Sequence, residues 1–219
     1  MDPVTFTTTD GARLEGELRL PDGPARGSAV LCHPHPRHGG SKDHPLLWAI
    51  RNDLAATRGL AVLSFNFRGV MGSGGTYGGG RDELRDAVAA VGEVRGRVAD
   101  DAPTLMVGWS FGASVAVRAA IDDRRVAALV LVGLPLRPGD VSLPPLPDAT
   151  DLRALRRPVL LLAGEHDEFA PSPQLRDYAA AFPEGRAEIV VGTDHYFWRR
   201  EREAAGIIGA FADDVLTRR

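Results

Sequence analysis

The chain has 219 residues, a length typical of one compact domain, and we expect a single domain over residues 1–219. Hydrophobic residues make up 44% and charged residues 25%, which are ordinary globular proportions and argue against disordered or fibrous architectures. The net charge of −3 gives no basic surface for collecting phosphates, so we expect neither nucleic acid nor a membrane as a partner.

The N-terminal sequence and the cysteine content bear on location. Residues 1–10 lack a basic segment followed by an apolar stretch, and no later run reaches the ~18 apolar residues that span a bilayer. We therefore expect a cytoplasmic protein. The single cysteine, Cys32, cannot form an internal disulfide, which agrees with a reducing compartment. Because Cys32 ends an apolar run, we expect a small buried strand residue rather than a reactive thiol.

Strands and helices alternate along the sequence. Two segments of alternating polarity, 4–8 and 13–20, are joined by Asp10-Gly11 and predict an antiparallel hairpin. Short apolar runs then predict buried strands at 28–32, 60–65, 104–107, 126–132, 159–163 and 187–191. Helical periodicity predicts helices over 45–57, 82–98, 111–121, 173–181 and 197–216.

This alternation predicts the α/β fold class, with a mainly parallel sheet and helices on both faces. In such folds ligands bind at the carboxyl ends of the strands. Two predicted loops follow strands and belong to that rim: a glycine-dense segment over 70–80 and a proline-rich segment over 134–147.

A G-x-S-x-G motif, Gly108-Trp109-Ser110-Phe111-Gly112, stands between a predicted strand and an Ala-rich helix. A nucleophile elbow needs this context, because the serine occupies a tight turn in which flanking glycines remove Cβ clashes. The following helix directs unpaired N–H groups at the developing oxyanion. The sequence therefore predicts Ser110 as a nucleophile, against the alternative of an idle serine in a glycine-flanked turn.

A nucleophilic serine needs a base and an acid that orients the base. Asp167 follows the predicted strand 159–163, and His195 stands in the loop before the last predicted helix. The order serine, aspartate, histidine is the one that this motif requires on this sheet. We predict Asp167 as the acid and His195 as the base.

Other ionisable groups lie near these two positions. Glu165, Glu168 and Asp194 are alternative acids, although solvated charges on the rim are the more ordinary interpretation. His166 precedes the predicted acid on the same turn, so we expect an exposed side chain.

The oxyanion hole needs a second N–H donor besides that of Phe111. The loop after the first parallel strand reads His33-Pro34-His35-Pro36, and the prolines have no N–H, so we predict the backbone of His35 as the donor. Three histidines in this loop, at 33, 35 and 38, could instead suggest a metal site, but their spacing to Cys32 and Asp43 fits no known zinc signature. We predict no metal.

The glycine-dense segment over 72–80 could be interpreted as a phosphate cradle. It has no Gly-Lys-Ser/Thr ending, and Tyr77 occupies the third glycine position of the Rossmann spacing. We therefore predict a flexible rim loop and no nucleotide cofactor.

Taken in order, several motifs resemble the compact, lidless α/β hydrolases related to dienelactone hydrolase, often described as predicted esterases. They are the 33–36 motif with Gly39-Gly40, the segment Phe65-Asn66-Phe67-Arg68-Gly69-Val70, the elbow, Gly164-x-x-Asp167 and the late His195. The resemblance covers nearly the whole chain. It implies a twisted, mostly parallel sheet of about seven or eight strands without a large lid, and hydrolysis of carboxyl esters without a cofactor.

The chain departs from this family at three points. Dienelactone hydrolase has a cysteine nucleophile where this elbow has Ser110, and the family often has glycine where Met71 stands and again near Asp82. Arg68 is expected to brace the adjacent loop by hydrogen bonds, or else to bind an acidic group of the substrate.

The sequence thus predicts a carboxylesterase-like serine hydrolase acting on a small-molecule ester. An amidase, peptidase or thioesterase with the same triad remains open, as does a non-catalytic binding protein with this fold. The oligomeric state stays unassigned. Between residues 133 and 157 there is no room for a helical cap, so we expect a shallow cleft that favours short acyl chains.

Overall fold

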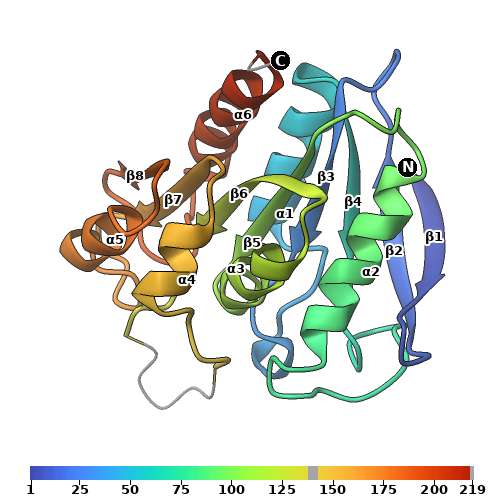
Figure 1. Ribbon diagram of the computed structural model, residues 1–219, viewed down its shortest axis with the longest axis horizontal. Coiled ribbons are helices and arrows are strands. Elements are labelled where there is room, and N and C mark those ends of the chain that lie inside the picture. The colour runs from blue at the N-terminus through green and yellow to red at the C-terminus, as the bar shows by residue number, and fades with distance from the viewer. Residues whose placement is uncertain (138–142, 218–219) are drawn as a thin grey trace.

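The computed structural model describes residues 1–137 and 143–217. One eight-stranded sheet runs through them, in the order β1-β2-β4-β3-β5-β6-β7-β8, with helices on both faces (Figure 1). The expected α/β class and the number of strands are therefore confirmed.

The sheet begins with the predicted hairpin. Strand β1 (Asp2–Thr7) pairs antiparallel with β2 (Arg13–Arg19), and β2 pairs antiparallel with β4. In the turn, Gly11 has a φ of 87° and donates its N–H to Thr8 O at 3.0 Å. A positive φ is unstrained for glycine, which is why Asp-Gly at this point was a reliable signal.

The remaining pairings are parallel. The parallel strands are β3 (Gly27–Cys32), β4 (Leu60–Phe65), β5 (Thr104–Trp109), β6 (Val126–Val132), β7 (Val159–Gly164) and β8 (Gly185–Val190). Strands β3, β4, β5 and β7 are buried along their whole length, so helices cover both of their faces. Cys32, at the end of β3, is fully buried as expected, and burial raises the pKa of its thiol.

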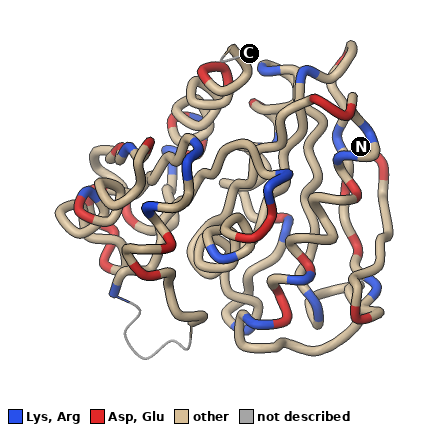
Figure 2. Tube along the Cα trace, in the orientation of Figure 1, with Lys and Arg blue, Asp and Glu red and all other residues tan. Residues whose placement is uncertain are grey.

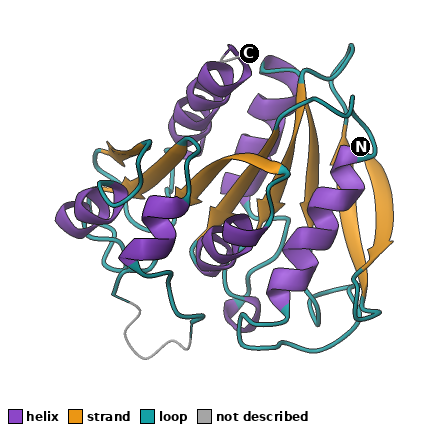
Figure 3. Ribbon diagram, viewed as in Figure 1, coloured by secondary structure: helices purple, strands orange, loops and turns teal. Residues whose placement is uncertain are grey.

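Helices divide between the two faces of the sheet (Figure 3). On one face lie α2 (Glu83–Arg95), α3 (Phe111–Asp122), α4 (Ala149–Ala154) and α5 (Ser172–Ala179). On the other lie α1 (Pro45–Asn52), which continues into a π-helical turn over Asp53–Thr57, and α6 (Glu201–Thr217). The helices on each face pack a separate apolar cluster against the sheet. Because strands β3 to β8 are parallel, their carboxyl ends lie at one rim of the sheet.

Two helix predictions need correction. Helix α6 begins at Glu201 rather than 197, because Phe197 and Arg199 have positive φ values of 56° and 64° that interrupt a helix. Helix α4 was not predicted. Its signal was Asp148, whose Oδ1 accepts hydrogen bonds from Thr150 N at 2.7 Å and Asp151 N at 3.0 Å and so caps the first turn.

Charged residues of both signs are interspersed over the elements of the described chain (Figure 2). Within the described ranges, no helix has both the length and the apolar run that a bilayer crossing requires. Residues 138–142 of the predicted proline-rich loop lie outside the described residues.

Candidate active site

Ser110 occupies the turn between β5 and α3, as the G-x-S-x-G motif predicts. Its φ of 56° and ψ of −118° lie outside the ordinary regions for a residue with a side chain. The turn is held by hydrogen bonds from Ser110 N to Val132 O at 2.8 Å and from Ala113 N to Ser110 O at 2.9 Å. Such a conformation costs ~1–3 kcal/mol and is typical of functional sites.

The two glycines of the motif are needed for close approach rather than for flexibility. A Cβ at Gly108 would lie 2.2 Å from the carbonyl oxygen of Gly112, and one at Gly112 would lie 2.2 Å from that of Cys32. Both contacts are with backbone, which cannot move aside. The elbow therefore packs directly against the end of β3, and this brings the loop after β3 toward Ser110.

Asp167 and His195 come from the ends of two neighbouring strands. Asp167 follows β7, and His195 follows β8; its Nδ1 lies 2.8 Å from Asp167 Oδ2. The other carboxylate oxygen accepts the backbone N–H groups of Phe169 and Ala170, both at 3.0 Å. The Asp167 side chain is fully buried and that of His195 is 9% exposed. With Nδ1–H donating to the carboxylate, Nε2 is left as the basic nitrogen.

Gly133 is a site residue that sequence reasoning missed. It has a φ of 51°, and a Cβ there would lie 2.9 Å from His195 Cε1 and 3.2 Å from Asp167 Oδ2. A side chain at this position would push the imidazole away from its carboxylate. The available signal was a glycine directly after the buried strand 126–132, at the same rim as the elbow.

Ser110 and His195 line the same cavity, whose volume is about 150 Å³. The lining residues are Pro34, His35, His38, Trp109, Ser110, Pro135, Leu143, Phe169, His195 and Tyr196. No hydrogen bond joins Ser110 Oγ to His195 among the described contacts. Catalytic hydrogen bonds are often long before substrate binds and tighten in the complex, so the shared cavity is the relevant observation.

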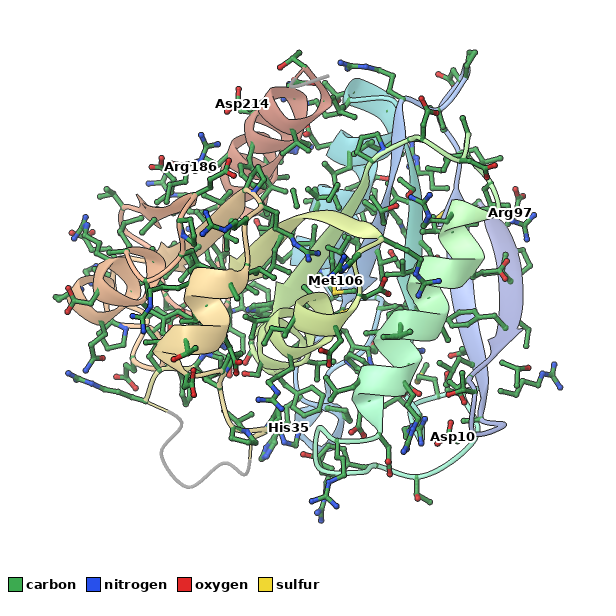
Figure 4. All side chains as sticks on the ribbon, in the orientation of Figure 1. Asp10, His35, Arg97, Met106, Arg186 and Asp214 are labelled. Carbon is green, nitrogen blue, oxygen red and sulfur yellow. The ribbon has the colours of Figure 1, made fainter. Side chains whose placement is uncertain are left out.

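One of the two predicted oxyanion donors, His35, lines this cavity, and the other, Phe111, directly follows Ser110 in the chain. Phe111 is the first residue of α3, where N–H groups have no partner within the helix. His35 is buried and lines the cavity at the lower rim of the sheet (Figure 4). Its ring is held in place, because Nδ1 accepts the N–H of Arg37 at 3.1 Å and Nε2 lies 3.1 Å from the hydroxyl of Tyr77.

Comparison with known proteins assigns the family. Residues 28–207 match the family model described as "Alpha/beta hydrolase domain". The chain belongs to the alpha/beta hydrolase family. An uncharacterized protein of Mycobacterium tuberculosis is 33% identical to this hydrolase, over 88% of this chain and 71% of the relative.

Solved structures agree on the fold. A lidless α/β serine hydrolase from Xanthomonas campestris is 24% identical to this hydrolase, with a TM-score of 0.82 over 100% of this chain and 96% of that chain. An esterase from Pyrococcus furiosus is 19% identical, with a TM-score of 0.79 over 97% and 92% of the two chains. The fold class expected from the sequence, an α/β-hydrolase fold, is confirmed, and residues 1–137 and 143–217 include no large lid.

The alternative acids of this hydrolase are engaged elsewhere or lie in solvent. Glu165 Oε2 accepts the N–H of Gly192 at 2.9 Å, and Asp194 Oδ1 accepts the N–H of Tyr196 at 2.9 Å. Glu168 is exposed, as is His166, in agreement with the expectation for that histidine. Among the acids that the sequence offered, Asp167 is the one bonded to His195.

The histidines after β3 do not form a metal site within the described residues, where no group of three His, Cys, Asp or Glu side chains could hold an ion. His33 is instead a buried structural residue of this hydrolase. Its Nε2 accepts the N–H of Phe67 at 3.0 Å, and its Nδ1 lies 2.6 Å from Pro34 O. Both nitrogens are thus engaged, which fixes the loop that carries His35.

The side chain of Arg68, just before the glycine-dense loop, joins the hairpin turn to α2, and that it braces the loop stays a prediction. Its guanidinium donates to Asp86 Oδ1 at 2.7 Å and to Asp10 Oδ2 at 2.9 Å, and its side chain is 6% exposed. The loop itself is tied at its far end, because Glu83 accepts the N–H groups of Gly78 and Gly80 at 2.7 Å each. Arg68 does not line the cavity, so its alternative role toward an acidic substrate has no structural support.

Proposed function

We propose that this hydrolase cleaves small carboxyl esters through an acyl-enzyme, with Ser110, His195 and Asp167 as its catalytic triad. One observation carries the proposal. A serine on a strained strand-to-helix turn and a histidine bonded to a buried carboxylate open into the same cavity. This combination supports Ser110 as a nucleophile, with His195 as its base and Asp167 as the group that orients the base.

In the proposed reaction, Ser110 Oγ attacks the ester carbonyl while His195 Nε2 takes the hydroxyl proton. His195 then delivers this proton to the alkoxide leaving group, and the acyl group remains on Ser110. Water gives up a proton to His195, attacks the acyl-enzyme and releases the acid. Asp167 holds the imidazole in the required tautomer and stabilises the imidazolium at each step.

We propose the backbone N–H groups of Phe111 and His35 as the oxyanion hole. The positive end of α3 supports the first donor, and the position of His35 at the cavity supports the second. The hydrogen bond from each donor is expected to strengthen as negative charge develops on the carbonyl oxygen of the substrate. No step of this mechanism requires a cofactor or a metal.

The size of the cavity supports a short acyl group. Its volume of about 150 Å³ is below the ~300–1,000 Å³ of pockets that enclose drug-sized ligands. Pro135 and Leu143, from the two described ends of the proline-rich loop, lie among its walls. We propose a preference for acyl chains from acetate to butyrate, with lower activity on octanoate.

A fluorophosphonate probe together with a panel of p-nitrophenyl esters and anilides tests the proposal. We expect one adduct on the wild-type protein, none on Ser110→Ala, and a loss of ~10⁴-fold or more in kcat for that variant with unchanged thermal unfolding. Hydrolysis of the anilides in preference to the esters would reassign the substrate class to amides. Absence of the adduct would contradict the nucleophile and favour a non-catalytic binding protein.

A further inference from the structure

Two exposed aromatic rings lie immediately beyond the proposed catalytic histidine. Tyr196 and Trp198 are 47% and 55% exposed, and their rings stack with centroids 6.2 Å apart and an interplanar angle of 23°. Aromatic side chains of this size are usually mostly buried, because each can remove ~150–250 Å² of surface from water. We call this pair the aromatic shelf.

The aromatic shelf is continuous with the cavity. Tyr196 is one of the lining residues, and its ring lies 5.7 Å from that of His195. Behind the shelf, the ring of His44 lies 4.3 Å from Trp109 of the elbow and 5.8 Å from Trp198. A line of rings therefore leads from the buried elbow to solvent along one side of the site.

Two strained backbone positions accompany the outward orientation of the aromatic shelf. Phe197, between the two exposed rings, is fully buried in the core with a φ of 56°, and Arg199 has a φ of 64°. Each left-handed residue with a side chain costs ~1–2 kcal/mol. This strain occurs at two positions within three residues. The Phe197 ring is buried in the core, while the rings of Tyr196 and Trp198 on either side are exposed to solvent. Such conformations cluster at functional sites.

We propose that the aromatic shelf binds a flat aromatic group in the alcohol part of the substrate. The inference rests on the proposed function. His195 delivers a proton to the leaving oxygen, so the alcohol part lies on the side of this histidine, where Tyr196 and Trp198 stand. The carbonyl oxygen faces the donors at the opposite side, His35 and Phe111. A flat ring on the shelf gains stacking beyond its apolar burial, which an aliphatic ring cannot match.

A pair of acetate esters tests the shelf: that of 2-naphthylmethanol and that of its decahydro analogue, which has the same carbon skeleton but is not flat. For the wild-type enzyme we expect kcat/KM to favour the aromatic ester by about 3- to 10-fold. Trp198→Leu should bring this ratio close to one, and Trp198→Phe should retain part of it. The change in ratio between variants is independent of the intrinsic reactivity of the two esters, because every variant receives the same pair.

Trp48→Leu is the matched control, because Trp48 is an equally exposed tryptophan (52%) whose described ring contacts include no cavity-lining residue, whereas Trp198 stacks on Tyr196. It should leave both rates and their ratio unchanged. If Trp198 had only a structural role, Trp198→Leu would lower both rates by the same factor, and an unchanged ratio would overturn the shelf.

Hydrolysis of ethyl acetate, which has no ring to bind, distinguishes a failure of the shelf from a failure of the proposed function. If the wild-type enzyme hydrolyses neither it nor the larger esters, ester hydrolysis itself fails and the shelf fails with it.

Discussion

The carboxylates of Asp86 and Asp167 are both buried, but Asp86 is paired with an arginine and Asp167 with a histidine. Asp86 meets the guanidinium of Arg68 on one oxygen at 2.7 Å and accepts the backbone N–H of Arg68 on the other at 2.9 Å. Asp167 meets backbone amides on one oxygen and His195 on the other, and the ring of His195 lines the cavity. The first cluster extends to Asp10, a partly exposed carboxylate of the hairpin turn, and does not reach the cavity. The second lies beside space that a substrate can enter.

This difference predicts a structural role for the Asp86 cluster and a catalytic role for the Asp167 cluster. Burial raises the pKa of Asp86, and Arg68 opposes that shift by pairing with the charged form. Such a closed ion pair fixes the segment after β4 against α2, and its loss should appear in stability. In the pair of His195 with Asp167, one ring nitrogen of the histidine is left for a substrate. Breaking this pair should therefore lower the rate of the reaction.

The largest expected effect breaks the second cluster. Asp167→Asn should lower kcat by ~10⁴-fold, because an amide favours the wrong tautomer of His195. Asp194→Asn is the matched control, since Asp194 lies beside the same histidine in sequence but accepts only a backbone N–H. Its effect on kcat should be mild. Steady-state kinetics on p-nitrophenyl acetate checks both, and a larger loss for the Asp194 variant would mean that the acid is misassigned.

Breaking the first cluster should act on folding instead. Arg68→Met leaves the buried Asp86 without its partner, so we expect the free energy of unfolding to fall by ~3–5 kcal/mol. Below the unfolding transition, kcat should stay close to that of the wild type. Urea unfolding measures the loss, and the double variant Arg68→Met/Asp86→Leu should recover part of it. A kcat that falls as far as in Asp167→Asn would show that the two clusters are not distinct.

A smaller effect concerns the buried histidine His33. Burial lowers the pKa of His33 to about 4, against ~6.5 in an unfolded chain. Between these values the unfolded chain binds a proton that the folded protein does not, so stability falls as the pH drops from 6.5 toward 4.

From pH 7 to pH 5 this residue alone should cost about 2 kcal/mol. Urea unfolding at the two pH values measures the change, with His33→Gln as the control that lacks the titrating ring. The variant should be less stable at pH 7 but lose less stability on acidification. Equal losses in both proteins would place the pH dependence elsewhere.

The smallest expected effect concerns the loop beside Arg68. Met71 is 75% exposed and has a φ of 50°, a conformation that costs a residue with a side chain ~1–2 kcal/mol. Met71→Gly removes this strain, and after the added backbone entropy of glycine we expect a gain of up to ~1 kcal/mol. Met71→Ala keeps the Cβ and should show no gain. Equal urea midpoints for the two variants would mean that the strain is absent.

The sequence by itself determined the order of the strands along the chain and the three residues of the proposed triad. Short apolar runs bounded by glycine or proline marked the central parallel strands, because both faces of β3, β4, β5 and β7 are buried. The run at 187–191 also found the edge strand β8, although that strand is only partly buried. The elbow motif stood between a strand and a helix, and Asp167 stood just after a strand end. These signals are local, so no knowledge of distant contacts was needed to find them.

Tertiary structure decided the rest. The need for glycine at 133 arises from the positions of His195 and Asp167, which are distant in sequence. The late start of α6 arises because Phe197 is anchored in the core, and this overrides the helical periodicity of 197–200. The place of Arg68 in an ion-pair cluster away from the cavity depended on hydrogen bonds between separate elements. Local patterns carry no information about such contacts, because packing fixes them only once the sheet has formed.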